Sequence, residues 1–239
     1  MKDENGYDYV NVNGNKIYVE CFELKLHGAG IKTLSDIKGL NEVDDLWNLF
    51  LRDNGLTKFD YLKNLISLEH IDLELNQFSR IDGLDYLINL KSLNLSYNFI
   101  LKIEGLLNLT NLTSLDLRWN QISEIENLGN LKNLEFLRLN NNNISEIKGL
   151  KDLTNLKILV LSNNKIKEIK GLDSLVNLKF LELDNNQITE IKGLKELQNL
   201  EVLSLNGNPI SQIKNIENLK KLTQISLINT NLKYKPELD

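Results

Sequence analysis

Apolar residues recur along the chain at a fixed spacing of 22 residues. In the stretch from Leu134 to Asn155, with Leu134 counted as place 1, leucine or isoleucine occupies places 1, 4, 6, 11, 14, 17 and 20, and asparagine occupies place 9. The alternation Leu137-Arg138-Leu139 has the period of two that a strand requires. The wider spacing that follows is typical of a turn and a short 3₁₀ or irregular segment. Each unit is therefore predicted to go out as a strand and to return as a tight coil.

This unit is repeated eight times without an insertion between residues 46 and 221. A fixed period of this length indicates a solenoid, in which each unit buries its apolar edge only against its neighbours. The asparagines at place 9 are the most regular polar feature. Because buried amides must be hydrogen-bonded, we expect them to bond the backbone where each strand becomes a loop, and so to be structural. This asparagine ladder consists of Asn54, Asn76, Asn98, Asn120, Asn142, Asn164, Asn186 and Asn208.

The consensus LxxLxLxxNxIxxIxGLxxLxN resembles the leucine-rich repeat, and the 22-residue form with EIKGL resembles the SDS22-like subclass. Internalins of Listeria share the repeat length, but their repeats typically read DISPL, and this chain contains only Pro209 and Pro236. The resemblance implies an α/β leucine-rich-repeat solenoid. It would be a right-handed horseshoe with a concave parallel sheet of about ten strands and a convex side of 3₁₀ or irregular segments. The fold hosts many unrelated binding roles, so it implies a scaffold without naming a partner.

The N-terminal end departs from the repeat. Residues 1–20 read as a β-hairpin cap, since Asn13-Gly14 suits the positive φ angles of a type I′ turn, and we expect the hairpin to run antiparallel to the sheet that it covers. Residues 21–45 form an atypical first repeat of 25 residues, with Cys21, Leu24 and Leu26 in the apolar strand places. A lone cysteine in such a place is expected to be a small core residue.

Residues 222–239 are predicted to be a partial terminal repeat and tail. Thr230 replaces the ladder asparagine, Leu232 fills place 11, and Lys235-Pro236 stops the pattern before a charged end. No dedicated C-terminal cap motif is recognised. We therefore expect a monomer, with dimerisation through the weakly capped C-terminal end, or a truncated chain, as the alternatives.

Composition narrows the function classes. The net charge of -5 argues against nucleic acid, and the chain contains no apolar run long enough to span a membrane. The N-terminus lacks the apolar core of a signal peptide, and the single cysteine excludes a disulfide framework, so a cytoplasmic location is expected. With two histidines and no phosphate loop, HExxH motif or Cys/His cluster, the sequence predicts no enzyme, no cofactor and no metal site.

The candidate binding surface lies on the concave face, at places 3, 5 and 7. Its first half is polar and locally acidic, with Asp72, Glu74 and Asp116, whereas its second half brings apolar residues into line at place 3. A contiguous apolar stripe usually marks an interaction site, and tyrosine, tryptophan and arginine dominate interface hot spots. The predicted partner-binding residues are Tyr97, Arg118, Trp119, Phe136, Arg138, Ile158, Val160, Phe180 and Val202. Shielding of the stripe by long neighbouring side chains, or self-association, remains the alternative interpretation.

The convex side carries opposite charges at places 13 and 15, and their signs invert near the fourth repeat. We expect ion pairs between residues two apart within a coil, which favour solubility and correct stacking; a partner that recognises the sign change is the alternative. The sequence thus predicts a non-enzymatic protein-binding scaffold, and the resemblance implies a phosphatase-regulator or signalling-adaptor role. An internalin-like extracellular adhesion module and a self-assembling structural protein are the alternatives.

Overall fold

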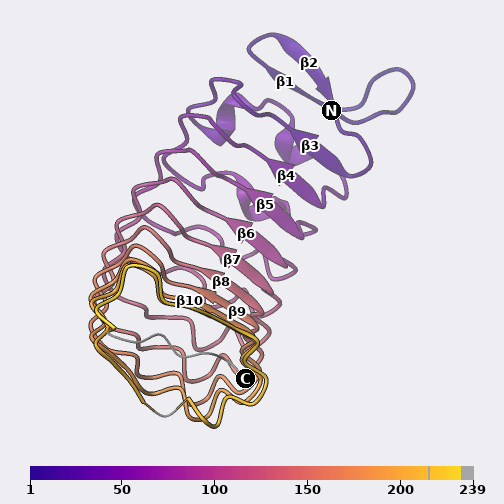
Figure 1. Ribbon diagram of the computed structural model, residues 1–239. Coiled ribbons are helices and arrows are strands. Elements are labelled where there is room, and N and C mark those ends of the chain that lie inside the picture. The colour runs from indigo at the N-terminus through magenta and orange to yellow at the C-terminus, as the bar shows by residue number, and fades with distance from the viewer. Residues whose placement is uncertain (215, 233–239) are drawn as a thin grey trace.

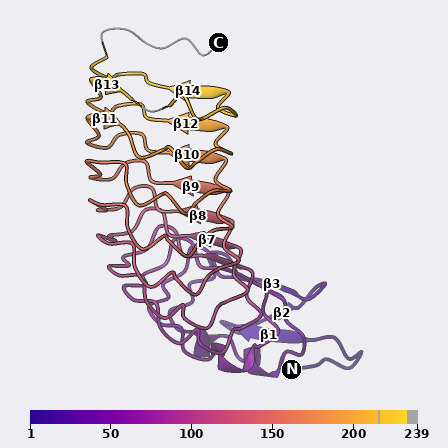
Figure 2. The ribbon, with the colours of Figure 1, turned by 90° about the horizontal axis from the view of Figure 1, so that it is seen from below.

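The computed structural model describes residues 1–214 and 216–232 as a curved stack of coils (Figure 1). Each coil contributes one short strand, and the strands line the inner side of the arc (Figure 2). They form one ten-stranded sheet in the order β14-β12-β10-β9-β8-β7-β6-β5-β4-β3. Its members are β3 (Glu23–Lys25), β4 (Asn48–Phe50), β5 (His70–Asp72), β6 (Ser92–Asn94), β7 (Ser114–Asp116), β8 (Phe136–Arg138), β9 (Ile158–Val160), β10 (Phe180–Glu182), β12 (Val202–Ser204) and β14 (Gln224–Ser226).

All neighbouring strands in this sheet are parallel. The register places each central leucine or isoleucine opposite the next, as in Leu115↔Leu137 and Leu137↔Leu159. The return side carries the 3₁₀ turns η1 (Leu34–Asp36), η2 (Leu40–Glu42) and η3 (Leu62–Asn64), and a two-stranded parallel pair, β11 (Glu190–Ile191) with β13 (Gln212–Ile213). The described residues contain no α-helix. The predicted leucine-rich-repeat solenoid, with a parallel sheet and 3₁₀ or irregular return segments, is confirmed.

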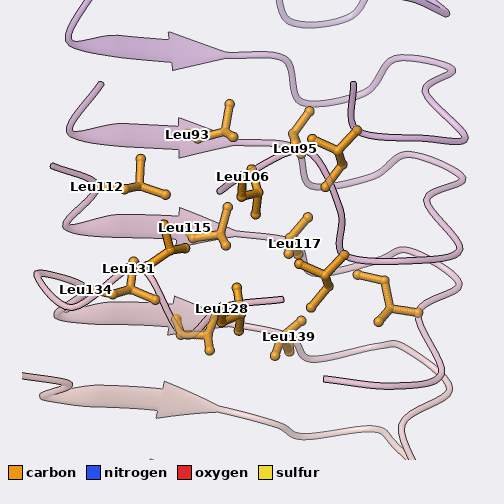
Figure 3. Close-up of a cluster of buried hydrophobic side chains, with 14 of the residues drawn as sticks. Leu93, Leu95, Leu106, Leu112, Leu115, Leu117, Leu128, Leu131, Leu134 and Leu139 are labelled. Atoms are coloured by element: carbon orange, nitrogen blue, oxygen red, sulfur yellow. The ribbon is translucent and has the colours of Figure 1, made fainter. Parts of the chain in front are cut away.

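The core is a continuous aliphatic column between the sheet and the return segments. Figure 3 shows the strand leucines Leu93 and Leu115 together with Leu106, Leu128 and Leu131 of the return segments, all of them buried. Burial of each such side chain contributes roughly 1.5–3 kcal/mol relative to leaving it exposed. Because a coil has no core of its own, this contribution exists only where neighbouring coils stack.

Close stacking also explains the glycine at place 16. Gly105, Gly149 and Gly193 have positive φ angles of +68, +73 and +75°, and an added Cβ at each would collide with the isoleucine carbonyl of the preceding coil. Glycine is the residue that combines this backbone conformation with such close approach. The G of the repeat therefore sets the distance between coils on the return side.

The N-terminal hairpin consists of β1 (Tyr9–Val12) and β2 (Asn15–Tyr18), joined through Asn13 and Gly14 with φ angles of +52 and +84°. Val10 and Val12 are buried in the core, so the hairpin covers the apolar surface of the first coil. The expected antiparallel arrangement against the main sheet is wrong, because the hairpin forms a separate sheet. Instead, Asn11 pairs antiparallel with Lys38 of the first return segment, through backbone hydrogen bonds of 2.9 and 3.0 Å.

The first repeat follows the shifted alignment in its strand, since Leu24 pairs with Leu49 and both Leu24 and Leu26 are buried. The expectation for Cys21 is wrong: its side chain is exposed. Cys21 and Phe22 have positive φ angles of +49 and +63° in a tight turn, which directs the cysteine away from the core. Sequence spacing alone could not show this turn.

At the C-terminal end, β14 continues the sheet in parallel with β12. Thr230, in the ladder place, donates its hydroxyl to the Leu227 carbonyl at 3.1 Å, which replaces one of the asparagine bonds, and Leu232 packs against the core. The predicted stop at Lys235-Pro236 and the charged tail lie outside the described residues.

Candidate protein-binding site

The sheet presents places 3 and 5 outward while its central leucines face the core. Strand register places Phe136 beside Ile158, Ile158 beside Phe180, and Phe180 beside Val202. With neighbouring strands about 4.8 Å apart, these four side chains form a line about 15 Å long. We call this line the apolar stripe. Its four members are partly buried, as are Arg138 and Val160 at place 5 in the adjacent line.

Arg138 stands where the apolar stripe meets the polar half of the sheet, because its strand pairs with that of Asp116. Burial raises the pKa of the Asp116 carboxyl above its ordinary value, while the backbone N–H of Arg118 and the charges of Arg118 and Arg138 oppose that shift. The Arg118 Nε lies 3.4 Å from Asp116 Oδ2, without the geometry of a hydrogen bond. The charges of both arginines therefore favour the ionised form of a buried carboxylate beside the stripe.

The acidic residues of the first half are engaged within the protein. Asp72 Oδ1 accepts hydrogen bonds from the Glu74 backbone N–H at 3.0 Å and from Asn94 Nδ2 at 2.9 Å. Glu74 is buried and lies 3.5 Å from an Arg52 guanidinium nitrogen. Over residues 1–214 and 216–232, no group of three or more His, Cys, Asp or Glu side chains could hold a metal ion.

Tyr97 and Trp119 lie on the loop edge, where the chain leaves the sheet. Their rings stack with centroids 5.4 Å apart and planes 13° from parallel, and the Arg118 guanidinium lies 6.0 Å from the Tyr97 ring centre. Both aromatic side chains are exposed, unlike the members of the apolar stripe. The predicted binding residues thus divide into a partly buried stripe on the sheet and an exposed stack at its edge.

Sequence reasoning missed three apolar neighbours of this stack. Leu75 occupies place 8 of the preceding coil, and Phe99 and Leu101 follow Tyr97 at places 10 and 12; all three are exposed. The other repeats from residue 46 onward carry glycine, polar residues or proline at place 10, and serine, threonine or lysine at place 12. Comparing these two columns across the repeats would have identified both residues.

The asparagine ladder is buried from Asn76 onward, and Asn54 is partly buried. Asn142 is typical: its Nδ2 donates to the Leu117 carbonyl of the preceding coil at 2.9 Å and to the Leu139 carbonyl at 3.1 Å, and its Oδ1 accepts from the Ile122 N–H at 2.9 Å. Each amide therefore joins two coils and has no group left for a ligand.

A second asparagine series, absent from the predicted site, occupies place 22 on the opposite edge. Each of its side chains donates from Nδ2 to a carbonyl of the preceding coil, as Asn133 does to Thr110 at 2.9 Å. The series comprises Asn89, Asn111, Asn133, Asn155, Asn177 and Asn199. Both loop edges are thus held by amide side chains, which keeps successive strands in register.

The convex charges form some of the expected pairs within a coil, and they also form pairs between coils, which sequence spacing did not predict. The shortest contacts join place 15 of one coil to place 13 of the coil before it, as in Lys148–Glu124 and Lys170–Glu146, both at 2.8 Å. The contacts within a coil are longer than these two: Lys170–Glu168 at 3.9 Å and Lys192–Glu190 at 3.5 Å. The hydrogen bond from Lys148 lowers the pKa of Glu124, and the same bond raises the pKa of Lys148. The shortest convex ion pairs therefore link neighbouring coils.

A hollow of about 660 Å³ lies on this convex side, lined by residues from Asn127 to Gly171. It is open and bordered by the side chains of the charge pairs, and it is remote from the apolar stripe. A small-molecule site is typically an enclosed, mostly apolar cleft. The hollow does not have that character.

The family model described as Leucine Rich repeats (2 copies) matches four overlapping segments: residues 88–130, 110–152, 132–174 and 154–196. No curated protein matches the chain significantly. None of the helices in the described part of the chain is long and apolar enough to cross a bilayer.

Solved structures similar to this chain include a leucine-rich-repeat protein of Leptospira interrogans, at 33% identity and a TM-score of 0.73 over 78% of this chain and 50% of that one. The chain thus spans half the length of that protein. An internalin C2 of Listeria monocytogenes shows 29% identity and a TM-score of 0.62 over 86% of this chain and 80% of its own. An internalin F from the same species shows 26% identity and a TM-score of 0.59 over 91% and 77%.

Proposed function

Because the chain is a leucine-rich-repeat solenoid, we propose that it is a non-enzymatic scaffold that binds another protein along its concave face. The observation that carries the proposal is the strand register, which joins Phe136, Ile158, Phe180 and Val202 into one apolar stripe on the sheet. Proteins of this fold are generally interaction modules, and the internalin-like neighbours support the same class. Arg138 and Val160, adjacent on the same sheet face, would complete the contact.

In this proposal, the partner covers the concave face of the sheet. Partly buried Phe136 and Phe180 are large enough to serve as anchors, with smaller Ile158 between them. An apolar anchor surrounded by polar residues is the usual arrangement of an interface hot spot. Resemblance to the SDS22-like subclass favours a regulator of phosphatases or a signalling adaptor, in the cytoplasm. The exposed free thiol of Cys21 agrees with a reducing compartment.

The test compares two double variants that differ only in which half of the sheet they change. Phe136→Asp with Phe180→Asp places two charges in the apolar stripe, whereas Ser92→Asp with Ser114→Asp places them at place 3 of the polar half. We expect the first variant to lose the proteins captured by the immobilised wild-type chain and the second to retain them. Circular dichroism checks that both remain folded, and quantitative mass spectrometry measures capture. Unchanged capture by a folded stripe variant would refute the proposal.

The second candidate is an internalin-like extracellular adhesion module, which the likeness to two Listeria internalins favours. It differs from the first in where the protein acts. Antibody detection in cytosolic, membrane and cell-surface fractions of the source organism separates the two. A signal confined to the soluble cytosolic fraction excludes adhesion, and one confined to the surface excludes the cytoplasmic scaffold.

A further inference from the structure

The residue directly before the asparagine ladder adopts the left-handed backbone conformation in every coil from residue 46 onward. Across these nine coils the φ angle at place 8 lies between +53 and +66°. Six of the residues are Asn, Asp or Gly, which tolerate this conformation: Asp53, Asn141, Asn163, Asn185, Gly207 and Asn229. The other three are Leu75, Tyr97 and Trp119, in three successive coils. Bulky residues are strained there, and such strain persists mainly where it serves a function.

The fold does not require these large side chains. The same turn, with the same ladder bonds behind it, is built with asparagine at place 8 in the next three coils. The three side chains lie outside the core cluster, and Leu75, Tyr97 and Trp119 are 37, 38 and 49% exposed. The strained backbone therefore presents part of each large apolar side chain to solvent.

Two further residues extend this surface across the edge. Phe99 and Leu101 are 52 and 53% exposed, and they alternate with the buried Asn98 and Ile100. Phe99 and Leu101 thus point outward from the stretch that follows the left-handed turn at Tyr97, and the rings of Tyr97 and Trp119 stack at that turn. We call the five residues Leu75, Tyr97, Phe99, Leu101 and Trp119 the apolar edge.

The size of the apolar edge indicates what can cover it. Five large side chains at these exposures present on the order of 400 Å², which is in the range of functional patches on monomers. A stable dimer needs about 800 Å² from each subunit, so the apolar edge alone is too small to hold a second copy of this chain. One short segment of another protein matches the area.

The spacing and charge of the apolar edge define that segment. Phe99 and Leu101 lie on either side of the buried Ile100 and are therefore about 7 Å apart, which is also the spacing of alternate side chains in an extended peptide. Lys102 follows Leu101 at the convex end of the row and forms no ion pair with the described residues. A carboxylate in the bound segment would complement its charge.

We propose that the apolar edge binds an extended peptide segment of another protein, with alternating apolar side chains and an acidic residue placed opposite Lys102. The apolar side chains of the peptide pack on Tyr97, Phe99 and Leu101, and the Trp119 ring and Leu75 border them. This surface is separate from the concave apolar stripe, and its role does not depend on a partner binding there.

The test replaces the large side chains at place 8 with asparagine, which occupies place 8 in the next three coils. A triple variant, Leu75→Asn with Tyr97→Asn and Trp119→Asn, removes three of the five side chains of the apolar edge and relieves the strained backbone at each of the three positions. The full wild-type chain is used to select from a displayed library of random twelve-residue peptides, and selected peptides are measured by fluorescence polarisation. Asn163→Ser, at place 8 outside the apolar edge, is the matched control.

We expect enriched peptides with alternating apolar residues and Asp or Glu, an affinity loss of at least tenfold in the triple variant, and no loss in the control. Lys102→Glu should weaken binding of the acidic peptides alone. The triple variant should melt at or above the wild-type temperature. A lower melting temperature would show that the side chains are structural. Absence of enrichment, equal binding to the triple variant, or a wild-type dimer that the variant abolishes in sedimentation would each overturn the peptide proposal.

Discussion

Replacing Asn142 with alanine tests whether the asparagine ladder holds the coils together. The change removes the hydrogen bonds of the side-chain amide, of which the three shortest are 2.9, 2.9 and 3.1 Å long. Two of these three join backbone groups of the preceding coil, and one lies within its own coil. At about 1 kcal/mol for each bond, the free energy of unfolding should fall by about 3 kcal/mol. The loss is greater where a buried partner stays unsatisfied, because its desolvation is then uncompensated.

The neighbouring Asn143 provides the matched control. Its side chain is exposed, and its Oδ1 accepts a hydrogen bond from Lys165 Nζ. Asn143→Ala should therefore change the free energy of unfolding by less than about 0.5 kcal/mol. Urea unfolding followed by tryptophan fluorescence gives the free energy of unfolding of both variants. In thermal unfolding, a loss of 3 kcal/mol should lower the melting temperature by about 6–12 °C. Equal stability of the two variants would refute the view that the buried amide joins the coils.

Two further substitutions test the stacking of the coils and the buried carboxylate. Gly149→Ala should lower the free energy of unfolding by about 3 kcal/mol or more, since the added Cβ meets the Ile125 carbonyl and φ is +73°. Gly129→Ala should be tolerated, because the added Cβ there meets only a side-chain carboxylate. Similar melting temperatures of the two variants in thermal unfolding would contradict this account. Burial raises the pKa of Asp116, so the folded chain retains a proton that the unfolded chain releases, and stability falls as pH rises through the interval between the ordinary and the raised pKa. Asp116→Asn should therefore be more stable relative to wild type at pH 7 than at pH 3 in urea unfolding, even though Arg118 loses its ionic partner, and the opposite order would show that the ion pair outweighs desolvation.

The sheet and its register could be predicted because the sequence period and the structural period coincide. When each coil contains 22 residues, Leu115 must lie beside Leu137, and every residue at place 3 must lie beside the next residue at place 3. The apolar stripe follows from the same rule. The 25-residue first repeat was recognisable because Leu24 still had to meet Leu49.

The candidate site was only partly predictable, because exposure depends on more than the column in which a residue falls. The apolar stripe is partly buried, whereas Phe99 and Leu101, which the pattern did not single out, are exposed. Cys21 occupies an apolar column but points outward, since two successive positive φ angles redirect the chain. Such local backbone choices are governed by contacts with neighbouring coils, which a repeat pattern does not specify.

The sequence by itself determined the solenoid, the order of its strands and the role of the asparagine ladder, because a strict period leaves one way for each apolar edge to be buried. Only the tertiary structure decided which charges meet. Lys148 pairs with Glu124 of the previous coil at 2.8 Å, although Glu146 is only two residues away in the sequence, because side chains at the convex surface reach across the stack. It also decided that Leu75, Tyr97 and Trp119 stand on left-handed backbone at one exposed edge, since φ at that place is fixed by hydrogen bonds between coils and not by the residue that occupies it.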